Sequence, residues 1–263
     1  MIHILTGWSK MGGSTEAFIN LTNLFNKNGY ECCLYGSDKF PAKRCNFKFI
    51  SEFDLNKNDI LISHFINPTN LLLFLKKTPQ KHILSCHETE LFQLKNLNYK
   101  VYDKIHFVSM WQKEWHNIDC PNFICSNIID PKLKNEKKNL NKKVGAVIGS
   151  IDLNKQTHIC IEKALEDGCE NVLLFGAITD SNYFENKIKS LLNEKILYLG
   201  IMEDKQRMYN SVTDVYNYSL KETFGLVQGE CIKTGTNYHS NFSNYHYMSE
   251  EKILNTWLKE FDL

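Results

Sequence analysis

The sequence contains no apolar run long enough to cross a membrane. The nearest candidate, residues 60–74, is interrupted by a histidine, a proline and two asparagines, whereas a membrane-spanning helix needs about 20 consecutive apolar residues. The first five residues, Met-Ile-His-Ile-Leu, are too short and uncharged for a signal peptide. We therefore expect a soluble, cytoplasmic protein with at most peripheral membrane contact.

An excess of either charge is also missing. The chain has 31 lysines and arginines against 30 aspartates and glutamates, so its net charge of +1 gives no reason to expect nucleic acid as a partner. Nine cysteines occur at irregular spacings and without a Cys-x-x-Cys pair. This usage does not match a disulfide framework, and we expect reduced, mostly buried thiols.

Several cofactor motifs are absent as well. The loop after the first predicted strand carries Gly7, Gly12 and Gly13 as G-x4-G-G rather than G-x-G-x-x-G, and no acid follows at the ribose position, which argues against NAD. His-Glu-Thr-Glu at residues 87–90 is not the zinc motif His-Glu-x-x-His. No Ser-His-Asp order stands out. The metal-binding motif Asp-x-Asp does not stand out either, and we predict no metal site.

What is present is a regular alternation of short apolar strands and amphipathic helices. We predict strands at 2–5, 31–35, 60–63, 83–86, 105–108, 144–148, 171–175, 196–199 and 214–218, and helices at 14–27, 70–77, 111–116, 156–166, 182–193, 204–209, 224–233 and 249–261. Such alternation predicts an α/β protein with parallel sheets covered on both faces.

A polar, lysine-rich run at residues 131–143 divides the chain. We predict that it links an N-terminal Rossmann-like domain, 1–130, to a C-terminal one, 144–247. Its lysines would also suit a membrane surface or an anionic acceptor, but a solvated linker is the simpler interpretation. The last segment, 248–263, carries an apolar helical stripe that we expect to pack at the domain junction.

The most informative stretch is the strand, turn and helix over residues 214–233, with Thr223 as the expected N-cap. This geometry presents N–H groups and the helix dipole to an anion. Glu222 and Glu230 bracket the turn. A carboxylate would repel a phosphate, so these acids better suit the hydroxyls of a sugar. The stretch suggests a nucleotide-sugar pocket; the alternative is two surface acids around an ordinary turn.

The same stretch resembles the E-x7-E signature of retaining glycosyltransferases of family 4, whose usual form is E-x-F-G-L-x-x-x-E followed shortly by a glycine. The residues in register are Glu222, Phe224, Gly225, Leu226, Val227, Glu230 and Gly235. The chain is identified as a short member of this family. The resemblance implies the GT-B fold, two Rossmann-like domains facing across a cleft, and a metal-independent, hexosyltransferase-like enzyme without a cofactor.

The reaction implied by the resemblance moves a sugar from a nucleoside-diphosphate sugar, a UDP-sugar being favoured, to an acceptor hydroxyl with retention. The acceptor would be a glycan, a lipid-linked molecule or another hydroxyl compound, as in bacterial or viral surface glycan synthesis. After Gly235 the chain is shorter than the family's usual C-terminal domain, so a homo-oligomer or a partner subunit is a further expectation.

The resemblance also implies residue roles on the donor side. Glu222 would bind the hydroxyls of the donor sugar and Glu230 those of the ribose, with backbone N–H groups offered by Phe224, Gly225, Leu226 and Val227. Residues 149–155 resemble the family's G-R-L-x-x-x-K-G, so Lys155 would hold the diphosphate, but Ser150 replaces the arginine. Candidates for the missing cation are Arg207 and Lys10.

Other implied roles lie in the first half. Gly12 and Gly13 would close over the diphosphate, although a tight turn between strand and helix is a serious alternative. His87, at the predicted carboxyl end of a strand, would position sugar and acceptor. Glu88 and Glu90 are candidate acceptor contacts, with a surface role favoured.

Two rival functions remain open. In the first, the chain is a non-catalytic nucleotide-sugar-binding subunit, and Ser150 marks the loss of activity. In the second, it is another GT-B enzyme, such as an epimerase or a DNA-modifying glycosyltransferase; the neutral charge disfavours DNA as the acceptor.

Overall fold

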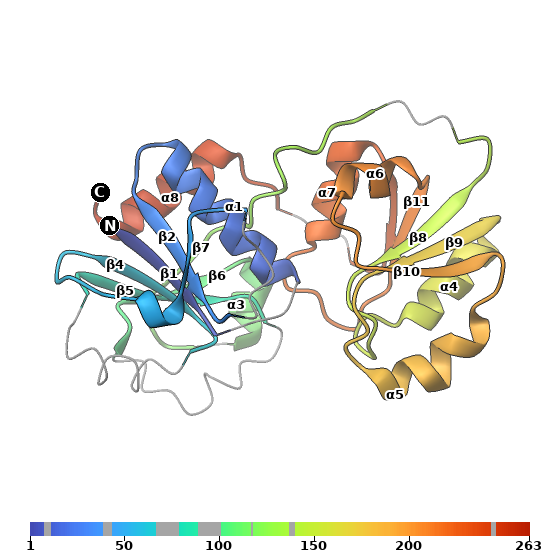
Figure 1. The fold of residues 1–263 in the computed structure, drawn as a ribbon, viewed down its shortest axis with the longest axis horizontal. Coiled ribbons are helices and arrows are strands. Elements are labelled where there is room, and N and C mark those ends of the chain that lie inside the picture. The colour runs from blue at the N-terminus through green and yellow to red at the C-terminus, as the bar shows by residue number, and fades with distance from the viewer. Residues whose placement is uncertain are drawn as a thin grey trace. The chain divides into compact units, whose positions relative to one another are not determined.

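The chain forms two compact units (Figure 1). The computed structural model describes residues 1–7, 12–38, 44–66, 79–88, 101–116, 118–136, 140–242 and 246–263. The first unit comprises Met1–Ile128 with His246–Leu263, and the second comprises Ile129–Tyr245. No described helix is long and apolar enough to span a bilayer. The nine cysteines all lie within the described residues; none forms a disulfide, and seven of them are buried.

The described part of the first unit contains a seven-stranded parallel sheet of order β3-β2-β1-β4-β5-β6-β7. Its strands are β1 (Ile2–Thr6), β2 (Cys32–Gly36), β3 (Phe47–Phe49), β4 (Ile60–His64), β5 (Lys81–Cys86), β6 (Lys104–Phe107) and β7 (Asn122–Ile124). Its helices are α1 (Gly13–Lys27), α3 (Met110–His116) and α8 (Glu250–Phe261), with a 3-10 turn at Ile50–Glu52. The chain runs outwards from β1 to β3 and then crosses to β4, so the strand order reverses between β1 and β4.

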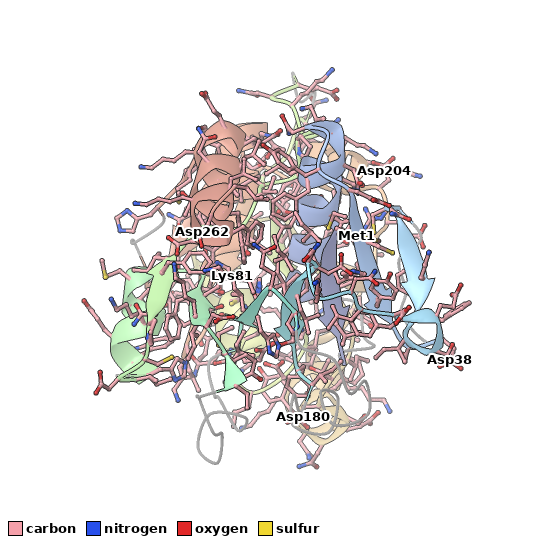
Figure 2. The ribbon with its side chains drawn as sticks, turned by 90° about the vertical axis from the view of Figure 1, so that its left-hand side faces the viewer. Met1, Asp38, Lys81, Asp180, Asp204 and Asp262 are labelled. Atoms are coloured by element: carbon pink, nitrogen blue, oxygen red, sulfur yellow. The ribbon has the colours of Figure 1, made fainter. Side chains whose placement is uncertain are left out.

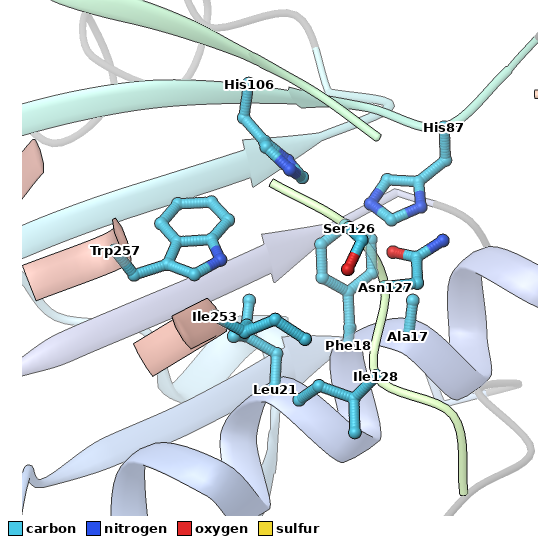
Figure 3. Close-up of a pocket in the computed structure, with 10 residues that line it drawn as sticks. All are labelled: Ala17, Phe18, Leu21, His87, His106, Ser126, Asn127, Ile128, Ile253 and Trp257. Atoms are coloured by element: carbon cyan, nitrogen blue, oxygen red, sulfur yellow. The ribbon is translucent and has the colours of Figure 1, made fainter. Parts of the chain in front are cut away.

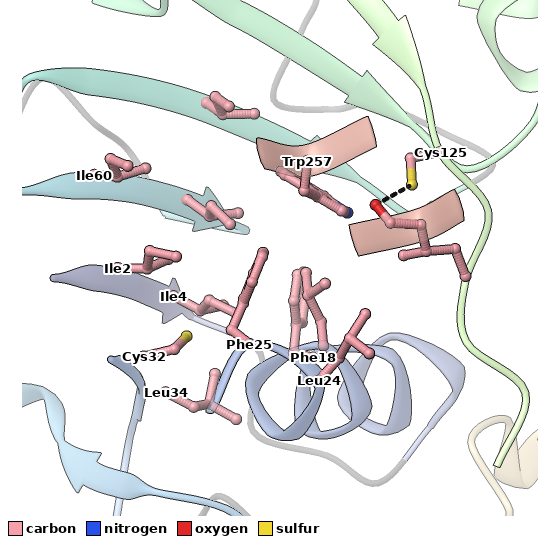
Figure 4. Packing of buried hydrophobic residues seen from close by; sticks show 14 of the residues in the cluster. Ile2, Ile4, Phe18, Leu24, Phe25, Cys32, Leu34, Ile60, Cys125 and Trp257 are labelled. Carbon is pink, nitrogen blue, oxygen red and sulfur yellow. Dashed lines mark hydrogen bonds between the residues drawn. The ribbon is translucent and has the colours of Figure 1, made fainter. Parts of the chain in front are cut away.

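The core of this unit is built where α1 and α8 meet the sheet (Figure 4). Phe25 of α1 packs against Trp257 and Phe261 of α8, with ring centroids 6.4 and 5.7 Å away. All three side chains are buried. The apolar stripe expected on the last helix is therefore part of the first unit's core. Lys81 at the start of β5 pairs with Asp262 just beyond α8, 2.7 Å away (Figure 2).

The described part of the second unit contains a five-stranded parallel sheet of order β10-β9-β8-β11-β12. Its strands are β8 (Val144–Ile148), β9 (Asn171–Phe175), β10 (Ile196–Gly200), β11 (Asp214–Asn217) and β12 (Asn237–Ser240). Its helices are α4 (Thr157–Glu166), α5 (Ser181–Tyr183), α6 (Lys205–Asn210) and α7 (Leu226–Thr234). Here the strand order reverses between β8 and β11.

The predicted α/β fold with parallel sheets is confirmed, and the differences are local. The short edge strands β3, β7 and β12 were not predicted. The helix predicted at 182–193 is instead one α turn followed by a π segment, Phe184–Ile188, and a 3-10 turn, Lys189–Leu191. The helix predicted at 70–77 lies outside the described residues.

Part of the segment expected to be a linker packs on the second unit. Leu133 is buried in that unit's core. Lys134 exchanges two hydrogen bonds with Gln206 of α6: its N–H donates to Oε1 at 2.9 Å, and its carbonyl accepts from Nε2 at 3.1 Å. Glu136 accepts a hydrogen bond from Asn210 at 2.6 Å. The start of this segment is therefore held in place by specific contacts.

Candidate active site

The candidate donor site lies where the strand order of the second sheet reverses. β8 and β11 are parallel neighbours, so the loops that follow them, 149–156 and 218–225, leave the same edge of the sheet. In open α/β sheets, ligands bind outside the carboxyl ends of the strands at such a reversal. Asn154 ties the two loops together: its side chain exchanges two 3.1 Å hydrogen bonds with the backbone of Lys221.

This connection brings Lys155 and Glu222 into contact, although 67 residues separate them. The Lys155 ammonium lies 2.8 Å from Oε2 of Glu222, and the two side chains are 21% and 17% exposed. Asn217 donates to the same carboxylate oxygen at 3.3 Å, and the Gly225 N–H donates to Oε1 at 3.3 Å. Glu222 is therefore fixed from three directions in a partly buried position.

The pair perturbs the ionisation of both groups. Burial would raise the pKa of the Glu222 carboxyl, but the Lys155 charge and the hydrogen bonds outweigh burial and hold that pKa below its ordinary value. Burial would likewise lower the pKa of Lys155, but the Glu222 charge outweighs it and leaves that pKa raised. Both groups are charged near neutral pH.

Two glycines shape the loop that carries Lys155. Gly149 has φ +144°, and a Cβ there would lie 3.4 Å from Cε of Lys155. Gly176, after β9, has φ +141°, and a Cβ there would lie 1.7 Å from the carbonyl oxygen of Gly149. Only glycine tolerates both this conformation and this contact. The backbone after β8 is thereby pressed against the backbone after β9.

Ser150, where the sequence resemblance would place an arginine, is hydrogen-bonded to a neighbouring acid. Its hydroxyl donates to Oδ2 of Asp152 at 2.5 Å, and Thr179 donates to the same oxygen at 3.0 Å. The other Asp152 oxygen accepts the Lys155 N–H at 2.9 Å. Arg207 lies exposed on α6, and its N–H donates to Asp204. Lys10 lies outside the described residues.

Glu230 occupies a different setting on α7. Its side chain is 4% exposed, and its Oε1 lies 2.6 Å from the Lys205 ammonium. Its Oε2 accepts a 2.7 Å hydrogen bond from the Tyr209 hydroxyl. Lys205 and Tyr209 lie four residues apart on α6, so they share a face of that helix. The sequence prediction missed both; their spacing and the position of α6 after β10 were the available signals.

The start of α7 differs from the expectation. The N-cap is Gly225, with φ +80°, rather than Thr223, and the helix begins at Leu226. The N–H of Gly225 is used by Glu222, and Phe224 is buried. Of the four expected N–H donors, Leu226 and Val227 lie in the first helical turn, where N–H groups have no acceptor within the helix.

In the first unit, Gly12 and Gly13 lie next to the point where the strand order of that sheet reverses. Gly12 caps α1, which begins at Gly13, at the carboxyl edge of the sheet. A Cβ at Gly7 would lie 2.2 Å from the carbonyl oxygen of Phe65, so the segments that follow β1 and β4 approach closely there. Like the second unit's loops, these segments flank a reversal of strand order.

His87 follows β5 at the same edge, within a cluster of histidines. Its ring centroid is 5.5 Å from that of His64 and 6.0 Å from that of His106. His64 contacts Thr6 through Nδ1 at 2.9 Å and Glu88 through Nε2 at 2.6 Å. The sequence prediction named His87 and Glu88 but missed the two histidines that the neighbouring strands supply; Glu90 lies outside the described residues.

A small cavity adjoins this cluster (Figure 3). Its volume is about 10 Å³, and its walls include His87, His106, Ser126, Asn127 and Trp257. The Ser126 hydroxyl is buried and has no hydrogen-bond partner among the described residues. A cavity of this size, with the Ser126 hydroxyl among its lining groups, has room for about one water molecule.

Comparison with solved structures identifies the architecture. HepE from Anabaena, solved in complex with UDP and glucose, is 13% identical over 91% of this chain and 80% of its own, with a TM-score of 0.70. TarM is 10% identical over 100% of this chain and 91% of its own, with a TM-score of 0.73. WaaG, a glycosyltransferase involved in lipopolysaccharide biosynthesis, is 10% identical over 100% and 91%, with a TM-score of 0.60.

The sequence itself matches no protein-family model and no curated protein. At identities near one residue in ten, structural similarity establishes the fold. The chain therefore has the mixed α/β, parallel-sheet fold of the GT-B glycosyltransferases.

Proposed function

We propose that the protein is a retaining glycosyltransferase that uses a UDP-sugar as donor. The observation that carries this proposal is the Lys155–Glu222 pair, which places a cation and a carboxylate side by side at the reversal point of the second sheet. A site that must hold both a diphosphate and a hexose needs these two chemistries side by side. The beginning of α7 adds N–H groups and a dipole for the phosphates.

The second unit binds the donor in this proposal. Lys155 contacts the diphosphate and Glu222 accepts hydrogen bonds from the sugar hydroxyls. Glu230 receives one hydrogen bond on each oxygen from Lys205 and Tyr209, and a carboxylate oxygen can accept another, so it retains capacity for the two ribose hydroxyls.

The reaction is a front-face substitution. The acceptor oxygen attacks the anomeric carbon on the side of the leaving group, and the bond from that carbon to the diphosphate breaks. The electron pair of that bond and the proton of the hydroxyl both go to the diphosphate oxygen. Lys155 stabilises the negative charge that develops there, and no metal is required. In the first unit, His87 positions the acceptor hydroxyl, and Gly12 and Gly13 allow close approach to the ligand.

The choice of UDP follows the neighbours. HepE was solved with UDP and glucose, and TarM with UDP and a GlcNAc-glycerol. The lipopolysaccharide role of WaaG suggests a surface glycan as acceptor, in the cytoplasm where such donors are made.

Incubation with UDP-glucose, UDP-galactose and UDP-N-acetylglucosamine tests the proposal, because glycosyltransferases slowly hydrolyse donors when no acceptor is present. We expect release of UDP and of a free sugar that initially keeps the donor's anomeric configuration by NMR. Release of the opposite anomer would contradict retention. No release from any UDP-, GDP- or other activated sugar would contradict the enzyme assignment.

A second candidate function is a non-catalytic nucleotide-sugar-binding subunit. It is favoured by Ser150, whose hydroxyl is held by Asp152 at the place of the family's arginine. Binding of UDP-sugars in calorimetry without any turnover would support it. The variant Ser150→Arg supplies the missing cation and keeps Asp152 paired. If the protein is an enzyme short of one cation, this variant should turn over about tenfold faster, the value of one charge-assisted hydrogen bond.

A further inference from the structure

A chain of hydrogen bonds connects His87 to β5, β6 and the residue that follows β7. His106 Nε2 lies 2.8 Å from the carbonyl oxygen of Cys125, and His106 Nδ1 lies 2.8 Å from Oγ of Ser85. The same Ser85 oxygen lies 3.1 Å from Nε2 of His87. Ser85 and His106 are buried, so their polar atoms depend on one another for hydrogen bonds.

Both rings are neutral near pH 7. Burial lowers the pKa of His106 to about 4, although its bond to Cys125 opposes the shift. Burial, with a smaller contribution from the neighbouring His64 and His106, holds the pKa of His87 well below its ordinary value. A neutral imidazole has one N–H donor and one lone-pair acceptor.

The direction of each hydrogen bond follows from this count. A carbonyl oxygen only accepts, so the His106 proton is on Nε2, and His106 Nδ1 is an acceptor. Ser85 has one hydroxyl hydrogen, which it must donate to His106 Nδ1. The Ser85 oxygen can then only accept from His87, so the His87 proton is on Nε2 and its lone pair is on Nδ1.

We propose that Ser85 and His106 are positioning residues that hold His87 in the Nε2–H tautomer, so that Nδ1 accepts a hydrogen bond from a hydroxyl of the bound acceptor next to the attacking one, whose own proton goes to the diphosphate. Because the carbonyl oxygen of Cys125 can only accept, it determines the direction of donation in all three hydrogen bonds, which we call the relay. Glu88 fixes the other side of His87: one of its oxygens accepts the His87 backbone N–H at 3.2 Å, and the other binds His64. The role of His87 in holding the acceptor rests on the proposed glycosyltransferase function, whereas the assignment of its tautomer does not.

Long-range nitrogen–proton NMR spectra of the 15N-labelled full chain test the tautomer directly. We expect one His87 nitrogen, Nδ1, at the shift of an unprotonated nitrogen and Nε2 at that of a protonated one. In Ser85→Ala, both His87 shifts should move towards the average of the two tautomers. In His106→Phe, the Ser85 hydroxyl has lost its acceptor and can donate to His87 Nε2, so the His87 tautomer should invert.

Ser63→Ala is a matched control, because Ser63 makes the same kind of contact with His82, at 2.9 Å, on the neighbouring pair of strands. It should leave the His87 shifts unchanged. A protonated Nδ1 in the wild-type protein, or His87 shifts that are identical in Ser85→Ala, would overturn the relay. If Ser85→Ala proves unstable in thermal melts, His106→Phe alone decides between the two outcomes.

Kinetics test the catalytic consequence. With an identified acceptor, Ser85→Ala should lower kcat about tenfold and leave KM for the UDP-sugar unchanged, and Ser85→Thr, which keeps the hydroxyl, should restore kcat. Unchanged kcat with the expected NMR shifts would overturn the positioning role. The expected NMR shifts without turnover of any donor sugar would instead refute the proposed function and leave the tautomer assignment standing.

Discussion

Lys155 and Glu222 form a partly buried ion pair, with 2.8 Å between Nζ and Oε2, that joins the loops after β8 and β11. Each charge satisfies the other. When a nucleotide sugar binds, the proposed function requires the diphosphate to share the lysine and the hexose to share the acid. The pair therefore keeps two opposite charges in place for two parts of one ligand.

Removing the cation should impair chemistry more than folding. Lys155→Met is expected to lower kcat by about 10² to 10³, because the charge that develops on the diphosphate loses its partner. Steady-state donor hydrolysis or transfer measures this loss. Lys163→Met is the control, since Lys163 is an exposed lysine on α4 paired with Glu166. Equal kcat values for the two variants would refute the role of Lys155.

Removing the Glu222 carboxylate should lower turnover at least as much as removing the Lys155 charge. Glu222→Ala is expected to cut turnover by several hundredfold or more if this carboxylate orients the donor sugar. The single-turnover rate at saturating donor measures it. Glu185→Ala, on the exposed surface of the same unit, should remain near wild type. Near-normal turnover of Glu222→Ala would contradict the assignment.

The same pair predicts a pH dependence of stability. The pKa of Glu222 is lowered in the folded protein, so its stabilising effect is fully present above the ordinary glutamate pKa of about 4.3 and is lost as pH falls through the folded-state pKa. The Tm difference between wild type and Glu222→Gln should therefore be constant from pH 5 to 8 and shrink at lower pH. A Tm difference that grows below pH 4 would contradict a lowered pKa of Glu222 in the folded protein.

The buried contact between α6 and α7 should be important for folding. Glu230→Gln removes the negative charge that pairs with Lys205 at a nearly buried position and is expected to cost about 1.5–3 kcal/mol. Urea unfolding measures the loss. Glu185→Gln breaks an exposed pair with Lys189 and should cost about 0.5 kcal/mol or less. Similar losses for the two variants would show that the burial of Glu230 adds nothing.

Two glycines with positive φ differ in what a side chain would meet. Gly176→Ala should destabilise the second unit strongly and lower activity, because its Cβ would lie 1.7 Å from the Gly149 carbonyl and displace the Lys155 loop. Gly168→Ala also has positive φ, at +80°, but meets nothing within 4 Å. It should cost only about 1–2 kcal/mol, the strain of the left-handed conformation. Thermal melts and donor hydrolysis compare the pair.

Elements with strong apolar periodicity were predictable, and polar or strained ones were not. α1 and the central strands follow the expected pattern because burial decides their side chains. β12, Asn-Tyr-His-Ser, is a polar edge strand without that pattern. The α7 start moved from Thr223 to Gly225 because the chain needs φ +80° there, which capping preferences alone do not reveal.

By itself, the sequence determined the α/β class, the two parallel sheets and the place of Glu222 and Glu230 around one turn, because these depend on local periodicity and spacing. Only the tertiary structure decided which side chains meet. The contacts of Lys155 with Glu222, of Lys205 with Glu230 and of Ser85 with His106 join neighbouring strands, loops and helices. Parallel strands place residues far apart in the chain at one edge, and no spacing rule in a single sequence encodes that proximity.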